Sequence, residues 1–213
     1  MAELTGKIAP QQFETLRDQI AAIITLELAA QYALYSPAEL VADPKQKVLN
    51  APVYLERMVP VTIDEKEVVN VQFAFGDFEG SSQVTTSDQS DGVHTFFIDC
   101  YSKGEANSAD SASKDSRLRL QRLVGAVRAI LMSPHYIRLG FDPPSIKRRK
   151  ITRLEMAEPK NEADAQAATI GRIIFEVEVP EVVELLVPGA LTKSLTQVKL
   201  LETELGHKYE IDT

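Results

Sequence analysis

The chain has 213 residues, of which 44% are hydrophobic and 25% charged, and its formal net charge is -8. This near-average composition excludes a disordered acidic chain, a collagen-like chain and a disulfide scaffold. Its single cysteine, Cys100, cannot form an intramolecular disulfide. The length suits one domain with extensions.

The charges are segregated along the chain. Residues 114–153 carry 11 basic and 2 acidic side chains, whereas residues 54–113 carry 3 basic and 11 acidic ones. The acidic excess over the whole chain disfavours general coating of nucleic acid, because polyanions repel each other. Charge placement is therefore the first indication of function.

The N-terminus does not have the pattern of a signal peptide, because Glu3 lies where a basic region is expected. The most apolar stretch, residues 20–26, is much shorter than the roughly 20 residues that a membrane-spanning helix needs. We therefore expect a soluble protein without a membrane partner, kept in a cytoplasm or in a particle assembled there.

Residues 10–35 predict an amphipathic helix that ends at Ser36-Pro37. Its apolar residues recur at spacings of three and four: Phe13, Leu16, Ile20, Ile23, Ile24 and Leu28. After a connector through Pro44, residues 48–53 predict a short strand.

Two strands are predicted next, at residues 69–75 and 93–101. In the first, alternation places Val69, Val71, Phe73 and Phe75 on one face. Residues 76–92 are rich in Gly, Ser, Thr and Asp, and we expect a long mobile hairpin loop there. This loop contains the acidic residues Asp77, Glu79, Asp88 and Asp91.

A second helix is predicted from the alanine-rich segment near residue 106 to Ser133-Pro134, with Asn107 or Ser108 as its cap. The small residues at its start, Ala106, Ala109 and Ala112, would let another backbone approach closely. The larger residues that follow would fill a core: Leu120, Leu123, Val124, Val127, Ile130 and Leu131.

Residues 146–156 and 170–179 predict a further pair of strands, joined by a polar link, and residues 182–186 and 196–205 predict strands in the tail. This order of elements predicts an α+β fold. We expect a mostly antiparallel sheet packed by two main helices, with a long hairpin loop and a C-terminal extension. We expect a core domain over residues 1–181 and an extension over residues 182–213.

The residues give no pattern for catalysis. The three histidines, His94, His135 and His207, lack metal-ligand spacing, and no glycine-rich phosphate loop or nucleophile motif is present. His94 and Cys100 point to the same side of a predicted strand but lie about 20 Å apart, too far for a catalytic pair. We expect no catalytic residue, no cofactor and no metal.

The basic band, residues 114–153, combines residues of the second helix with a cluster on the following strand. Alternation predicts Lys147, Arg149 and Arg153 on one side of that strand and Arg148 and Lys150 on the other. So many charges cannot be buried without partners, so we expect them in solvent or at an interface. Three interpretations stay open: a solvated surface, pairing with the acidic blocks of a neighbouring copy, or binding to nucleic-acid phosphate. The last is weakened because no aromatic residues lie among the basic ones to stack on bases.

The order of elements also resembles a known family. A long helix precedes two strands, the second of which ends in Asp99-Cys-Tyr101, and spaced alanines lead into the helix at residues 119–131. A hairpin of two long strands follows. Over residues 10–180 this arrangement resembles the tail terminator (tail completion) and neck proteins of tailed bacteriophages.

The resemblance implies a non-enzymatic ring, often a hexamer, in the virion. Such a ring caps the tail tube, contacts tube and sheath proteins, docks to the head connector and lets DNA pass through its lumen. Opposite charges on separate blocks would allow head-to-tail contacts around a closed ring. The candidate interface residues are Lys114, Arg117, Arg122, Lys147, Arg148, Arg149, Lys150 and Arg153, with Asp77, Glu79, Asp88 and Asp91. The alternatives are another head–tail neck or completion protein, or a nucleic-acid-binding adaptor that uses residues 147–153.

Overall fold

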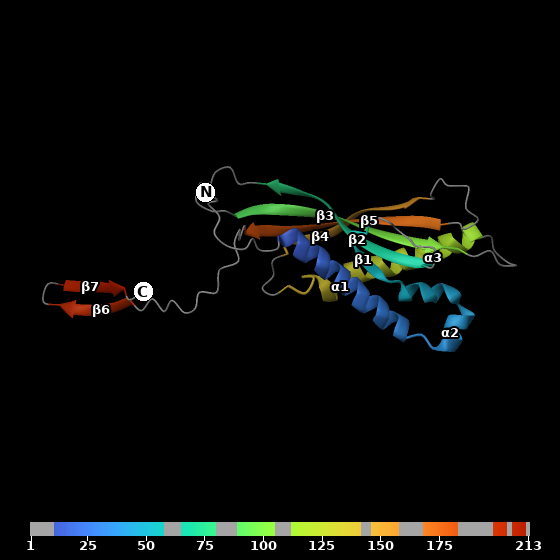
Figure 1. The fold of residues 1–213 in the computed structure, drawn as a ribbon, viewed down its shortest axis with the longest axis horizontal. Helices are drawn as coiled ribbons and strands as arrows, with labels where there is room; N and C mark the ends of the chain where they lie inside the picture. Colours follow the sequence, from blue (N-terminus) through green and yellow to red (C-terminus); the bar gives the residue numbers. More distant parts are fainter. Residues whose placement is uncertain are drawn as a thin grey trace. The chain divides into compact units, whose positions relative to one another are not determined.

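The computed structural model describes residues 11–57, 65–79, 89–104, 112–141, 146–157, 168–182, 198–203 and 206–211. Groups of helices and groups of strands follow one another along the chain, and the predicted α+β class is confirmed (Figure 1). The helical elements are α1 (Gln12–Ala33), α2 (Pro37–Ala42), η1 (Pro44–Asn50), α3 (Ala112–Met132) and η2 (Pro134–Tyr136). The strands are β1 (Val53–Leu55), β2 (Glu67–Glu79), β3 (Gln89–Lys103), β4 (Arg148–Ala157), β5 (Ala168–Val182), β6 (Val198–Thr203) and β7 (Gly206–Ile211).

The main sheet has five strands in the order β1-β2-β3-β5-β4. All neighbours are antiparallel except β1 and β2, which run parallel. The hairpins β2–β3 and β4–β5 therefore join through a long β3–β5 ladder. Mostly antiparallel pairing was predicted and is confirmed.

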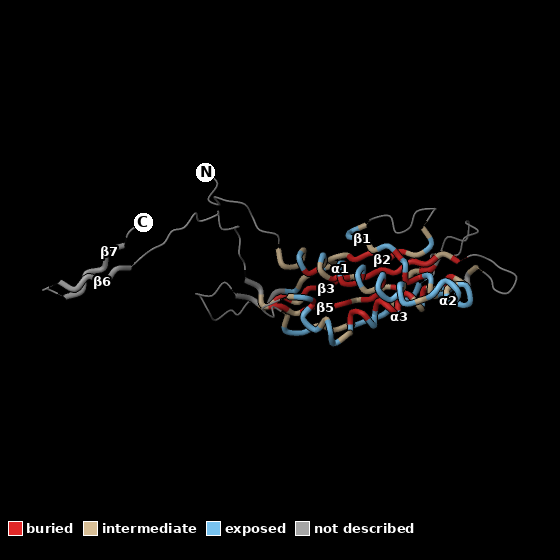
Figure 2. Tube along the Cα trace, turned by 90° about the horizontal axis from the view of Figure 1, so that it is seen from below, coloured by how far each residue is buried: buried red, intermediate tan, exposed pale blue. Residues whose placement is uncertain are grey.

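Helices α1 and α3 pack on the same face of this sheet (Figures 1 and 2). The apolar stripe of α1 is buried from Leu16 to Leu28, and the predicted stripe of α3 is buried from Leu120 to Leu131. The sheet supplies alternate residues to the same core, such as Val69, Val71, Ile98, Ile173 and Phe175. The sequence periods of these helices and strands thus identify the core correctly.

The short strand predicted at residues 48–53 is wrong over most of its length. Residues 44–50 form the 3-10 helix η1, where Pro44 takes the first position and the Asp43 carboxylate accepts a hydrogen bond of 3.3 Å from the Lys45 N–H. The adjacent side chains of Val48 and Leu49 are both buried. A strand sends neighbouring side chains to opposite faces, so this apolar pair suits a helical turn.

The predicted position of Phe75 is also wrong. The register of β2 shifts between Phe73, which lies opposite Phe96, and Phe75, which lies opposite Thr95. This β-bulge reverses the side of every later residue. Phe73 stacks on Phe13 at 4.5 Å between ring centroids, whereas Phe75 is 51% exposed.

The long loop predicted at residues 76–92 is wrong at both ends. Residues 76–79 of β2 pair with residues 91–94 of β3, so Asp77, Glu79 and Asp91 belong to strands. Asp88 lies outside the described residues, as do the predicted caps of α3, Asn107 and Ser108, and the alanines Ala106 and Ala109.

The chain divides into two compact units. Residues 10–183 form the unit that contains the five-stranded sheet. In the other unit, β6 and β7 pair antiparallel, from Val198 opposite Ile211 to Thr203 opposite Gly206. Strand β6 lies within the stretch predicted as a strand at residues 196–205, and residues 183–186 lie outside the described part.

Candidate interaction surface

Charged residues line the face of the main sheet that α1 and α3 do not cover. Residues directly opposite each other on neighbouring strands point to the same face of a sheet. The strand register therefore shows which residues belong to this face. We name it the charged face. Its members include Asp77, Asp91, Asp99, Arg148, Lys150, Arg153, Glu155, Arg172, Glu176 and Glu178.

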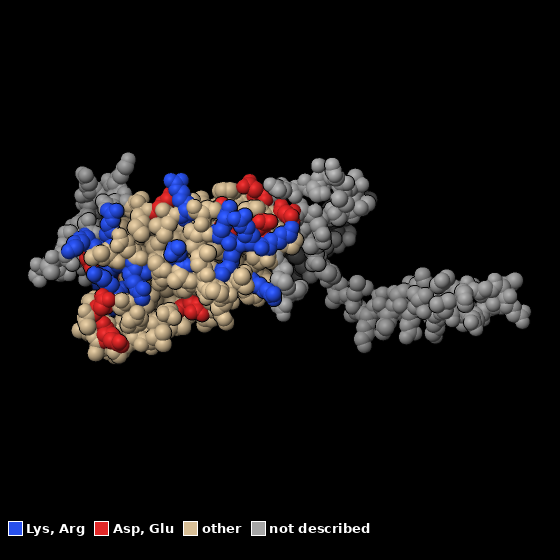
Figure 3. Space-filling model, turned by 180° about the vertical axis from the view of Figure 1, so that it is seen from behind, with Lys and Arg blue, Asp and Glu red and all other residues tan. Residues whose placement is uncertain are grey.

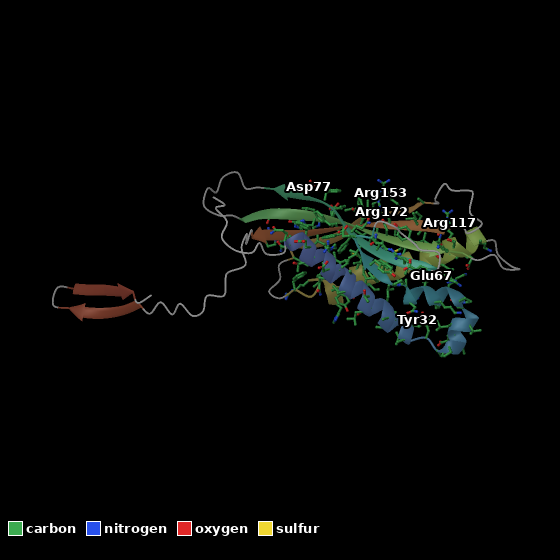
Figure 4. All side chains as sticks on the ribbon, viewed as in Figure 1. Tyr32, Glu67, Asp77, Arg117, Arg153 and Arg172 are labelled. Atoms are coloured by element: carbon green, nitrogen blue, oxygen red, sulfur yellow. The ribbon has the colours of Figure 1, made fainter. Side chains whose placement is uncertain are left out.

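A buried ion pair lies on the two central strands of this face. The Arg172 guanidinium of β5 donates two hydrogen bonds, of 2.7 and 2.8 Å, to the two carboxylate oxygens of Asp99 on β3. The Asp99 side chain is only 2% exposed, whereas that of Arg172 is 37% exposed. Arg172 also lies over the Phe97 ring at 4.3 Å from its centroid. Figure 4 shows Arg172 among the side chains of the sheet.

Tyr101 completes this cluster, with its hydroxyl donating a 3.4 Å hydrogen bond to Asp99. Burial, followed by the negative charge of Asp99, raises the pKa of Tyr101 to about 12. The phenol therefore stays protonated and serves as a donor to the carboxylate. The cluster joins β3 to β5 across the middle of the sheet.

Three candidate cations at β4 form ion pairs within the chain. Lys147 pairs with Asp91 at 2.5 Å, Lys150 with Glu176 at 2.7 Å, and Arg153 with Glu155 at 2.8 Å. All three cations are well exposed, so each pair contributes little to the free energy of folding. Such pairs can exchange their partners at a contact with another molecule.

Two other candidates have structural partners instead. Arg149 donates to the backbone carbonyl of Leu131 and, at 2.6 Å, to that of Ser133, where α3 ends. The Leu131 carbonyl lies in the last turn of α3, where carbonyls lack partners within the helix, so the guanidinium caps this end of α3. Burial lowers the pKa of Arg149. Arg122 on α3 donates to Gln46 at 2.8 Å and to the Tyr35 hydroxyl at 3.3 Å.

The prediction of a basic band in solvent or at an interface overlooks ion pairs within the chain. The predicted side of Arg153 is also wrong. A bulge between Ile151 and Arg153 places Arg153 on the charged face with Arg148 and Lys150, while Arg149 points toward the helices.

The remaining basic candidates, Lys114, Arg117 and Arg148, are exposed. Arg117 lines a groove of about 280 Å³ beside β4, together with Leu120, Met156, Ala157 and Thr169. Arg148 lines a smaller hollow of about 160 Å³ on the charged face, with Val93, Lys150, Glu176 and Glu178. Figure 3 views the molecule from behind relative to Figure 1. On that side, basic side chains cover more of the surface than acidic ones.

The acidic candidates fall on neighbouring strands. Asp77 is exposed on β2, and Glu79 is opposite Asp91 of β3 in the register. Figure 4 shows Asp77 on β2.

His94 and Cys100 are both buried on the helix-covered side of β3. The His94 ring lies 6.1 Å from that of Phe73 and 6.3 Å from that of Phe13, measured between centroids. Burial, followed by the charge of Asp99, raises the pKa of the Cys100 thiol. Over the described residues, no group of three or more His, Cys, Asp or Glu side chains is arranged to hold a metal ion. None of the helices described is long and apolar enough to cross a membrane.

Sequence reasoning missed two buried ion pairs. One is Asp99–Arg172; the other is Glu67–Arg119, whose charged atoms lie 2.5 Å apart. Burial raises the pKa of Glu67, and the charge of Arg119 opposes this effect. A single charged residue in an otherwise apolar strand, such as Asp99 after Phe96, Phe97 and Ile98, is the signal that points to such a pair.

Comparison with known proteins adds no relative, because no protein-family model and no curated protein matches this sequence.

Proposed function

We propose that this protein is a structural subunit of a tailed-phage virion. In this role it is a tail terminator: copies form a ring, with six as the expected number, that caps the tail tube and docks it to the head connector. DNA passes through the lumen, and the ring contacts tube protein, sheath protein and connector. The protein performs no catalysis and needs no cofactor.

The observation that carries the proposal is the arrangement of the elements on which the resemblance rests. The chain has, in the expected order, helix α1, the β2–β3 hairpin, α3 and the β4–β5 hairpin, and the two hairpins combine into one sheet. Both helices cover one face, and charged side chains of both signs lie on the other. A surface of alternating charge suits repeated contacts between protein subunits, because complementary charges fix the register of a contact.

The alternative of a nucleic-acid-binding adaptor is less well supported. Such an adaptor needs basic groups that are free to meet phosphates. Arg148 is exposed, but Lys147 and Lys150 contact carboxylates of the same chain, and Arg149 caps α3. Another head–tail neck or completion protein would share the features described, and the position on the tail tube separates these roles.

Sedimentation of the full chain at low and high salt, with and without a labelled DNA duplex, tests the proposal. We expect a mass of several chains at low salt, dissociation as salt rises, and no co-sedimentation of DNA. A chain that stays monomeric both alone and with tail-tube protein contradicts the ring. DNA binding at low salt that falls steeply with added salt would instead support the adaptor.

A further inference from the structure

Within the described residues, the five-stranded sheet has a free backbone edge on each side. Strand β4 is last in the sheet order, and β5 is its one partner among the strands described. On the other side, β1 pairs with residues 69–71 of β2, and no strand in the described ranges pairs with the outer side of residues 74–79. The N–H and C=O groups along such edges are templates for a further strand.

The two edges have opposite charge. Strand β4 carries four basic side chains and one acidic one, whereas residues 74–79 carry two acidic side chains and no basic one. Pairing β4 with β4 of another copy, or β2 with β2, would bring like charges together. Pairing β4 of one copy with β2 of the next would bring opposite charges together, so it is the favoured combination.

One row of directly opposite residues crosses the sheet from β2 to β4 and ends in a charged side chain at each edge. In the register, Asp77 is opposite Val93, Val93 is opposite Glu178, and Glu178 is opposite Arg148. Asp77 and Arg148 are exposed, and neither side chain forms a hydrogen bond or ion pair within the described structure. A neighbouring copy that continued this row would place its Asp77 beside Arg148 on the same face.

The adjoining rows are compatible with the same contact. The next row runs from Phe75 through Thr95 and Glu176 to Lys150, and Phe75 is 51% exposed. Continuing it would place the Lys150 ammonium beside an exposed aromatic ring, which is a favourable contact. Between these two rows lie Gly76 and Arg149. Arg149 is held at the end of α3, and Gly76 has no side chain to obstruct the approach.

Strand direction also fits. Each of the pairs β2–β3, β3–β5 and β5–β4 is antiparallel, so β4 runs opposite to β2. A copy repeated in the same orientation therefore presents its β2 antiparallel to β4. Strand β1 occupies the outer side of residues 69–71, and β4 bulges after Ile151. These two features limit the contact at one end, and the start of β4 at Arg148 limits it at the other, which leaves residues 148–151 of one copy and 74–77 of the next.

We propose that copies of this chain join head to tail by adding β4 of one copy to β2 of the next, with Arg148 opposite Asp77. The inference rests on the proposed ring and specifies how its subunits meet. Because the two edges are different surfaces, the contact is heterologous, and it repeats until a ring closes.

A charge exchange tests the contact. In Arg148→Glu the contact would place a carboxylate opposite Asp77, and in Asp77→Lys it would place an ammonium group opposite Arg148, so each variant alone should assemble roughly tenfold or more weakly than the unaltered chain. In an equimolar mixture each variant has a complementary neighbour, and alternating assembly should be restored to within about threefold of the original. Sedimentation at several protein concentrations gives both numbers.

The matched control is Arg128→Glu, which makes the same charge change at an exposed position on α3. It should assemble like the unaltered chain, and thermal unfolding should show that all variants are folded. Normal assembly of the single variants overturns the inference, and so does a mixture of folded variants that fails to assemble.

A disulfide separates this inference from the proposed function. Within one copy, residues 77 and 148 are three strand spacings apart, roughly 14 Å, beyond the approximately 7 Å between Cα atoms that a disulfide spans. The double variant Asp77→Cys with Arg148→Cys can therefore link only between copies, and the native Cys100 is buried. We expect a ladder of covalent oligomers after oxidation. Rings on tail tubes without a ladder overturn the edge pairing alone, whereas a ladder without rings on tubes overturns the terminator role alone.

Discussion

Asp99 and Arg172 are unequal partners in the ion pair that links β3 to β5. Asp99 is 2% exposed and Arg172 is 37% exposed. If the arginine is removed, a carboxylate stays behind in a buried site, and if the carboxylate is neutralised, the guanidinium can still reach water. The free energy lost should therefore depend on which partner is changed.

We predict that Arg172→Met destabilises the protein by roughly 2–4 kcal/mol and Asp99→Asn by about half as much. Methionine keeps an apolar stem over Phe97, so its effect reports the lost charge more than lost packing. Urea unfolding of both variants and of the double variant measures these losses and the coupling between the sites. A larger loss for Asp99→Asn would show that the asymmetry of burial does not control the pair.

The sequence identifies the charged residues but not their partners. Asp99 and Arg172 are 73 positions apart, and they meet only because β3 and β5 are neighbours in the sheet. Arg149 likewise finds its carbonyl partners only where α3 ends above β4. Such pairings depend on strand order, which local periodicity does not contain.

At the scale of elements, periodicity predicts the helices and the long strands well and fails at two bulges. One extra residue between Phe73 and Phe75, and another between Ile151 and Arg153, reverses the facing of the residues that follow. A strict period of two therefore places Phe75 and Arg153 on the wrong side. The strand predicted at residues 48–53 fails for a different reason, because residues 44–50 form the helical turn η1, in which the adjacent Val48 and Leu49 are both buried.

The start of α3 packs closely against the sheet, and Gly104 makes this approach possible. A side chain at Gly104 would overlap the backbone carbonyl of Ala112, where α3 begins. At Gly171 an added Cβ would lie 2.6 Å from a methyl group of Val124. By contrast, an added Cβ at Gly125, also on α3, meets nothing within 4 Å.

We predict opposite signs for two glycine substitutions. Gly104→Ala should destabilise the protein by about 2 kcal/mol or more, because backbone atoms must move. Gly125→Ala should stabilise it by roughly 0.5–1 kcal/mol, because alanine loses less backbone entropy in a helix. Thermal unfolding measures both, and a stable Gly104→Ala variant would refute the close approach of α3.

In the whole sheet, the charge segregation seen along the sequence becomes a spatial arrangement. The strand order places the basic strand β4 at one edge and the acidic part of β2 at the other. The sequence shows that the charges are separated, but the pairing of β3 with β5 is what moves them to opposite edges. A chain with complementary edges is suited to repeated contact with its own copies.

We propose that copies of this chain form a ring at the end of a tail tube. Electron microscopy of the purified full chain, alone and mixed with tubes assembled from phage tail-tube protein, makes such rings visible. We expect a closed ring seated at one end of each tube. Tubes whose ends stay bare at saturating protein would contradict it.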